Sequence, residues 1–78
     1  MTATRHFSLD VEDRPDVLPR IVTVVRRRGG DIVALSFACG DRHRPARLEL
    51  AVRAEERLGA RLGGYLRALV DVRDVREA

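Results

Sequence analysis

Residues 11–36 limit the possible folds of this 78-residue chain most strongly, because they contain a helix flanked by two strand-like segments. An apolar stripe at helical spacing starts at Val17, and Gly29 follows three consecutive arginines, as is typical of a helix end. Pro19 is tolerated only within the first turn of a helix. The helix is therefore predicted to begin near residues 15–16.

Four segments have the pattern of strands. Residues 6–12 and 46–53 alternate apolar and polar side chains, which is typical of strands with one buried face. Residues 32–39 carry no charge, and Cys39 is expected on the buried face of that strand as a small hydrophobic residue. Residues 70–75 predict a short last strand, whose alternation slips and so indicates a bulge or an early end.

A second helix is predicted over residues 55–69, where leucines and Tyr65 recur on one helical face. The order of elements is therefore βαββαβ, and two helices with one apolar stripe each can cover one face of a sheet. Right-handed crossovers then predict an α+β, ferredoxin-like sandwich with an antiparallel four-stranded sheet of order 4-1-3-2 and both helices on one face. Residues 6–76 are expected to form this single domain, with tails at residues 1–5 and 77–78.

The predicted strand order places the uncharged segment 32–39 at an edge of the sheet, where such a strand tends to pair with another chain. A domain this short buries only about 60% of its unfolded surface, and one cysteine cannot form an intrachain disulfide. We therefore expect a homodimer in which this strand pairs with its own copy. Alternation along this strand predicts that Val33, Leu35 and Phe37 face the core. The predicted dimer edge strand comprises Val33, Ala34, Leu35, Ser36, Phe37 and Ala38.

The composition argues against several classes of function. All 15 basic residues are arginine, but acidic residues alternate with them and the net charge is only +3, which does not favour a nucleic-acid surface. RNA binding on this fold would also need aromatic residues on the open sheet face, and the few present are expected elsewhere. No catalytic constellation is apparent: serine occurs only at Ser8 and Ser36, both on predicted strands. An acylphosphatase on this fold would need an asparagine, and the chain has none. We therefore expect a protein that is not an enzyme.

Isolated polar residues have simple structural interpretations. His6 and His43 are expected to be solvated, because no further metal ligand or nucleophile has suitable spacing. The arginines at 26–28 are expected to form a solvated helix end, and those at 42 and 44 a loop tip. No cofactor and no metal site is predicted. The chain has no apolar segment near 18 residues and no signal peptide, so we expect a cytoplasmic protein that does not enter the membrane.

Two phrases of the sequence resemble the ACT domain. They are Val-Glu-Asp-Arg-Pro-Asp-Val-Leu-Pro-Arg at residues 11–20 and Arg-Arg-Arg-Gly-Gly-Asp-Ile-Val-Ala-Leu-Ser at residues 26–36. The closest resemblance is to the ACT domain of the small regulatory subunit of acetolactate synthase (acetohydroxyacid synthase). Residues 66–75 resemble that subunit's second helix running into its last strand, and the likeness covers residues 6–76.

The resemblance implies a non-catalytic module that binds an amino acid at a dimer interface and regulates a partner enzyme, here the catalytic subunit of acetolactate synthase. In such subunits the effector is typically a branched-chain amino acid, such as valine, leucine or isoleucine. It lies between the turn after the first strand of one chain and the start of the second strand of the other. Carried onto this sequence, the effector site comprises Asp13, Arg14, Pro15, Asp16, Val17, Leu18, Gly30, Asp31 and Ile32.

The chain differs from the family pattern at three of these positions. Asp13 and Asp31 stand where the family usually has asparagine or, at the first position, another polar residue, and Asp16 stands where it usually has glycine. Two further functions therefore stay open: a dimerisation module without a ligand, and support of the catalytic subunit without an effector. A ferredoxin-like domain that binds nucleic acid through its arginines is a weaker alternative.

Overall fold

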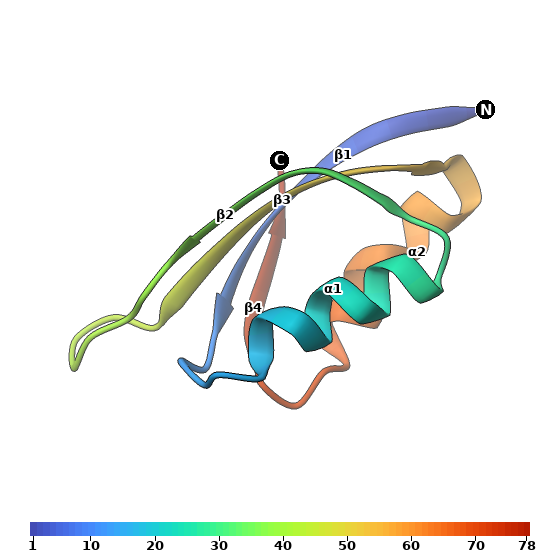
Figure 1. Cartoon of the computed structure of the whole chain (residues 1–78). Helices are drawn as coiled ribbons and strands as arrows, with labels where there is room; N and C mark the ends of the chain where they lie inside the picture. Colours follow the sequence, from blue (N-terminus) through green and yellow to red (C-terminus); the bar gives the residue numbers. More distant parts are fainter.

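The chain folds into a four-stranded antiparallel sheet with two helices on one face (Figure 1). The structure is a computed structural model, and it describes all of residues 1–78. Its elements are β1 (Thr2–Val11), α1 (Val17–Arg27), β2 (Asp31–Ala38), β3 (Ala46–Glu55), α2 (Glu56–Arg67) and β4 (Val72–Glu77). The strand order β2-β3-β1-β4 is the predicted order 4-1-3-2 read from the other edge. The ferredoxin-like fold is thus confirmed, and β2 is an edge strand.

One apolar core lies between the sheet and the helix layer. α1 contributes its buried stripe, α2 contributes two leucines, and the strands contribute the side chains that alternate toward the helices. The core cluster consists of Phe7, Leu9, Val11, Val17, Ile21, Val25, Ala46, Leu48, Leu50, Val52, Ala54, Leu62, Leu66 and Val75. Valines are weak helix formers, so α1 is held by this packing more than by intrinsic propensity. Neither helix is long and apolar enough to cross a membrane.

The two ends of α1 follow from local chemistry. Pro19 is the third residue of the helix, where its missing N–H costs no intrahelical bond. At the other end, the backbone N–H groups of Gly29 and Gly30 donate to the carbonyls of Arg26 and Val25, both at 3.0 Å. Gly29 has a φ of +96°, a left-handed conformation that favours glycine at a helix stop.

The first and last strands of the chain extend beyond residues 6 and 76, into the segments 1–5 and 77–78 that were expected to be tails. β1 begins at Thr2, because β3 continues to Glu55 and pairs with it in register. β4 runs to Glu77, which is opposite Phe7 on β1. Residues 2–5 lack alternating large apolar side chains, so their backbone pairing left no pattern in the sequence.

A bulge in β2 overturns part of the predicted side-chain alternation. Ile32 is opposite Val52 and Ala34 is opposite Ala51, so Val33 has no partner on β3. Val33 is therefore 49% exposed, and Ile32 packs against the core in its place. The register beyond the bulge still places Phe37 against the core.

Cys39 is exposed, and the prediction of a buried cysteine is wrong. β2 ends at Ala38, one residue earlier, where the chain leaves the sheet for the hairpin to β3. The slip predicted in the last strand is confirmed, because Asp10 is opposite Asp74 while Val11 is opposite Val72. Arg73 is therefore the extra residue of a bulge in β4.

Candidate functional site

The turn from β1 to α1 forms the first half of the predicted effector site. Asp13 accepts a hydrogen bond from the backbone N–H of Gly40 at 3.2 Å, which ties this turn to the end of β2. Asp16 is paired with the guanidinium of Arg20 at 2.5 Å and makes no side-chain cap bond to the helix. The side chain of Val17 is buried in the core and does not line an open site. Both acidic side chains of the turn are therefore already engaged.

Asp71 holds the β1–α1 turn through a backbone hydrogen bond and two ion pairs, a role that the sequence did not suggest. It is only 7% exposed, and its carboxylate accepts a hydrogen bond from the guanidinium of Arg20 at 2.6 Å. The guanidinium of Arg14 forms a longer ion pair with it at 3.9 Å. Its backbone carbonyl also accepts from the N–H of Glu12 at 2.8 Å. The sequence placed Asp71 within the last strand, predicted over residues 70–75. It lies instead in the turn before β4, where it neutralises two arginines of the β1–α1 turn and α1.

The start of β2 forms the second half of the predicted site. Gly30 is buried, and a Cβ placed there would come within 2.9 Å of side-chain carbons of both Val25 and Val52. Asp31 is exposed and lies 3.8 Å from the guanidinium of Arg53. Ile32 is half-buried against the core. These residues border a surface depression of about 330 Å³ beside the last turns of α1.

A single chain does not bring the two halves together. They lie at opposite ends of α1, whose 11 residues span about 16 Å at 1.5 Å per residue. The resemblance to the ACT domain predicts that the two halves of the site come from different chains. The distance between the halves within one chain agrees with this prediction. The proposed effector residues therefore remain a prediction that depends on a second copy of the chain.

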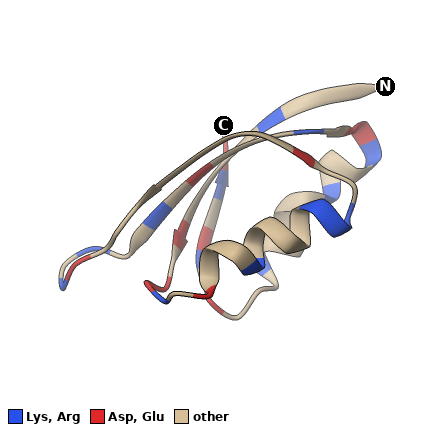
Figure 2. Cartoon of the chain, in the orientation of Figure 1, with Lys and Arg blue, Asp and Glu red and all other residues tan.

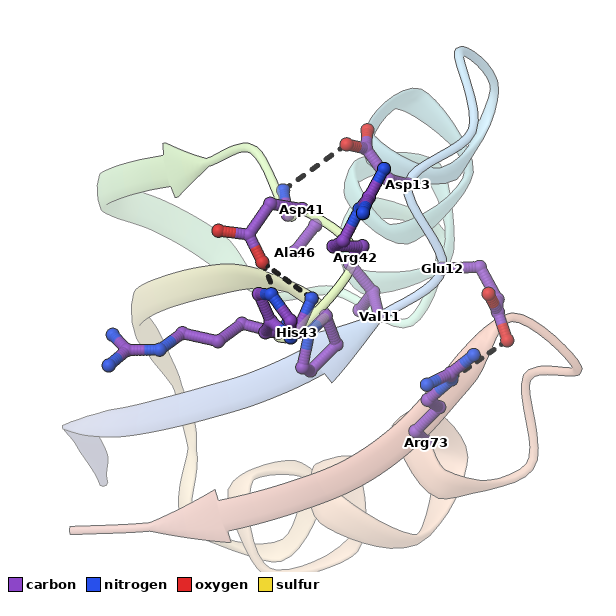
Figure 3. A pocket seen from close by; sticks show the side chains of 11 residues that line it. Val11, Glu12, Asp13, Asp41, Arg42, His43, Ala46 and Arg73 are labelled. Carbon is purple, nitrogen blue, oxygen red and sulfur yellow. Dashed lines mark hydrogen bonds and ion pairs between the residues drawn. The ribbon is translucent and has the colours of Figure 1, made fainter.

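A polar pocket of about 420 Å³ lies beside the first half, between the β1–α1 turn, the β2–β3 hairpin and the start of β4. Figure 3 shows Asp13, Asp41 and Arg42 along one side of it and the pair of Glu12 with Arg73 at the other. Asp41 accepts from the backbone N–H groups of the two residues at 43 and 44, at 2.7 and 2.9 Å, and so shapes the hairpin. The sequence patterns did not indicate that the hairpin lines a pocket. The shape of the hairpin depends on these hydrogen bonds, which apolar and polar spacing does not reveal.

Charged residues are interleaved along the strands, whereas the C-terminal end of α1 is basic (Figure 2). On the open sheet face, Arg76 lies 3.0 Å from Asp10 and also pairs with Asp74. All three aromatic side chains belong to or pack against the core on the helix side, so the open face has no platform for stacking bases.

Two carboxyl groups, Asp10 on β1 and Glu12 directly after this strand, link stability to pH. The hydrogen bond from Arg76 lowers the pKa of Asp10 below its usual 3.8, and the hydrogen bond from Arg73 lowers the pKa of Glu12 below its usual 4.5. Because both pKa values are lower in the folded chain, their stabilisation is complete above the usual values. It is lost as the pH falls through the folded values.

We expect the free energy of unfolding to fall from about pH 5 to about pH 2, and the Asp10→Asn, Glu12→Gln double variant to show a flatter profile. Urea unfolding at several pH values measures this dependence. Glu56→Gln is the matched control, because this exposed residue has no ion-pair partner. An unchanged slope in the double variant would contradict the assignment.

Comparison with protein-family models matches residues 13–75 to the ACT domain. Comparison with curated proteins found no match. Among solved structures, the small subunit of acetolactate synthase from Thermotoga maritima superposes with a TM-score of 0.81 and 20% sequence identity. The match covers 96% of this chain and 47% of that one, so this chain spans about half the length of that subunit.

Two other solved structures share the fold. The ACT domain from the GTP pyrophosphokinase of Chlorobium tepidum superposes with a TM-score of 0.78 and 14% identity over 100% of both chains. A homoserine dehydrogenase from Thiobacillus denitrificans superposes with a TM-score of 0.78 and 18% identity, over 99% of this chain and 17% of that one. A family match over most of the chain, on the fold described above, establishes that this chain belongs to the ACT domain family.

Proposed function

We propose that this chain is a non-catalytic, cytoplasmic regulatory module that acts as a homodimer. In this proposal it binds a branched-chain amino acid between its two copies and regulates the catalytic subunit of acetolactate synthase or a related enzyme. The resemblance of residues 11–20 and 26–36 to the small subunit of that enzyme supports the choice of partner, and ACT domains are regulatory modules.

The observation that carries the proposal is the exposed edge of β2. This strand lies at the end of the sheet, and Val33 and Leu35 are 49% and 40% exposed on it. The strand carries no charged side chain beyond Asp31 at its first position. Unpaired backbone groups next to exposed aliphatic side chains favour pairing with an identical strand. A two-fold antiparallel pairing would join the two sheets into one of eight strands.

The same pairing would complete the effector site. In an antiparallel pair, the start of β2 in one copy lies beside the end of β2 in the other. The end of β2 is where the hydrogen bond from Gly40 to Asp13 holds the β1–α1 turn. The depression at Gly30 of one copy would therefore face the turn of its partner.

A second candidate is a module that supports its partner enzyme without an effector. The ion pair between Asp16 and Arg20 favours this alternative, because it occupies the turn where the free N–H groups of a helix start would otherwise receive a carboxylate. The two candidates share the dimer and differ only in whether an amino acid binds.

A titration of valine, leucine and isoleucine distinguishes the two candidates. If the effector site is present, the melting temperature rises and then saturates. At an amino-acid concentration 100 times Kd the gain is about 2.7 kcal/mol, which corresponds to roughly 10–20 °C in a domain of this size. Glycine, which has no side chain to bury, is the control ligand. A melting temperature that is unchanged at millimolar concentrations of all three would leave the second candidate.

The partner enzyme needs a separate measurement. A tagged chain is expected to retain a thiamine-dependent acetolactate synthase catalytic subunit when the two are expressed together. A chain that forms dimers and binds an amino acid but never retains this subunit would contradict the choice of enzyme while leaving the regulatory module intact.

A further inference from the structure

The depression at the start of β2 has the side chains needed to recognise a whole amino acid. It has a volume of about 330 Å³, within the range of small-molecule sites. Three of the lining residues are aliphatic and two carry opposite charges. They are Val22, Arg26, Gly30, Asp31, Ile32 and Leu35.

Arg26 is available to bind an anion. It lies in the last turn of α1 and is exposed, and no carboxylate lies within 4.0 Å of it. Seven of the 15 arginines are ion-paired, and among the other eight only Arg26 lines this depression. A guanidinium binds a carboxylate through two parallel hydrogen bonds, which makes it the preferred group for this recognition.

Asp31 is available to bind a cation. Its side chain is 76% exposed, and its one ion-pair partner, Arg53, is at the long distance of 3.8 Å. Together with Arg26 it gives the depression one positive and one negative group. This pair matches the two charges of a free amino acid and leaves the occupied pocket neutral.

The opposite end of α1 is unsuited to a carboxylate. Asp13 and Asp16 are both exposed there, and Asp16 is already held by Arg20. The two arginines nearest this turn, Arg14 and Arg20, both face the buried Asp71, so neither is free to bind a carboxylate.

These observations rest on the proposed effector function and specify it further. We propose that the effector's head group is recognised at the C-terminal end of α1, where Arg26 binds the carboxylate and Asp31 binds the ammonium group. Val22, Ile32 and Leu35 form the aliphatic surface that selects a branched side chain. This orientation is the reverse of one in which the helix start holds the carboxylate.

The test compares two neighbouring arginine variants of the full chain. Arg26→Ala is expected to weaken valine binding about 10- to 100-fold, measured by calorimetry, because it removes a hydrogen-bonded charge pair. Arg27→Ala is the matched control, since it lies on the same helix end but does not line the depression. Valinamide, which lacks the carboxylate, is expected to bind Arg26→Ala and the unmodified chain equally.

Three outcomes would overturn the inference in distinguishable ways. If the unmodified chain binds none of the three branched-chain amino acids, the effector function fails and the inference fails with it. If valine binds and both arginine variants bind it equally, the effector function stands and the role of Arg26 is refuted. If Arg26→Ala weakens valine and valinamide equally while sedimentation shows dissociation of the dimer, Arg26 is an interface residue and does not bind the carboxylate.

Discussion

Replacing Val33 and Leu35 by glutamate is expected to convert the proposed dimer into monomers at micromolar concentration. The exposed part of each aliphatic side chain contributes about 1 kcal/mol when it is buried. A two-fold interface contains each residue twice, so the loss is about 4 kcal/mol, or roughly a thousand-fold in the dimer Kd. Glutamate adds repulsion between like charges on paired strands, which increases the effect.

Analytical ultracentrifugation of the double variant measures this prediction. Val70→Glu is the matched control, because Val70 is 87% exposed in the turn before β4, far from the β2 edge. It makes the same change of side chain and is expected to leave the dimer intact. An unmodified chain that sediments as a monomer at 100-fold higher concentration, or a double variant that stays dimeric, would refute pairing along β2.

Gly40→Ala is expected to lower the free energy of unfolding by about 1–3 kcal/mol. A Cβ at Gly40 would lie 2.6 Å from the backbone nitrogen of Ala46 and the carbonyl oxygen of Arg44, and 2.8 Å from the carbonyl carbon of Pro45. All three atoms are backbone, so no side chain can rotate away and the hairpin must open. The total stability of a domain this size is about 4–12 kcal/mol, so the loss is a large fraction of it.

Urea unfolding at one fixed protein concentration measures the effect, since dimer formation would otherwise shift the result. Gly64→Ala is the control. A Cβ at this helical glycine has nothing within 4 Å, and the change is expected to stabilise the chain by about 1 kcal/mol. A Gly40→Ala variant as stable as the unmodified chain would show that the hairpin adapts without cost.

Opening the hairpin would also affect the proposed site. The N–H of Gly40 donates to Asp13, so a displaced hairpin releases the β1–α1 turn from the end of β2. We therefore expect Gly40→Ala to weaken any binding of valine as well as lowering stability.

Element order, helix ends and strand order were predictable from the sequence because each depends on local spacing. The apolar stripe from Val17 and the glycine stop at Gly29 mark α1 without reference to the rest of the chain. The slip in the last strand correctly indicated the bulge at Arg73. Once the order βαββαβ was known, the handedness of crossovers left few arrangements.

Contacts between distant segments were not predictable from spacing. The exposure of Cys39 depends on where β2 leaves the sheet, and the bulge at Val33 depends on its register with β3. The strand at residues 2–5 exists because β3 extends far enough to pair with it.

The candidate site shows the same division. The sequence resemblance named the residues of the site, but tertiary contacts determine which of their charged side chains are ion-paired. Asp16 is held by Arg20, which is in turn held by the buried Asp71, 51 positions further along the chain. Arg26 has no such partner and borders the depression at Gly30. The sequence by itself determined the periodicity that builds the ACT fold, because periodicity is a property of neighbouring residues. Only the tertiary structure decided which charges are paired and which are free, because pairing depends on segments that meet after folding.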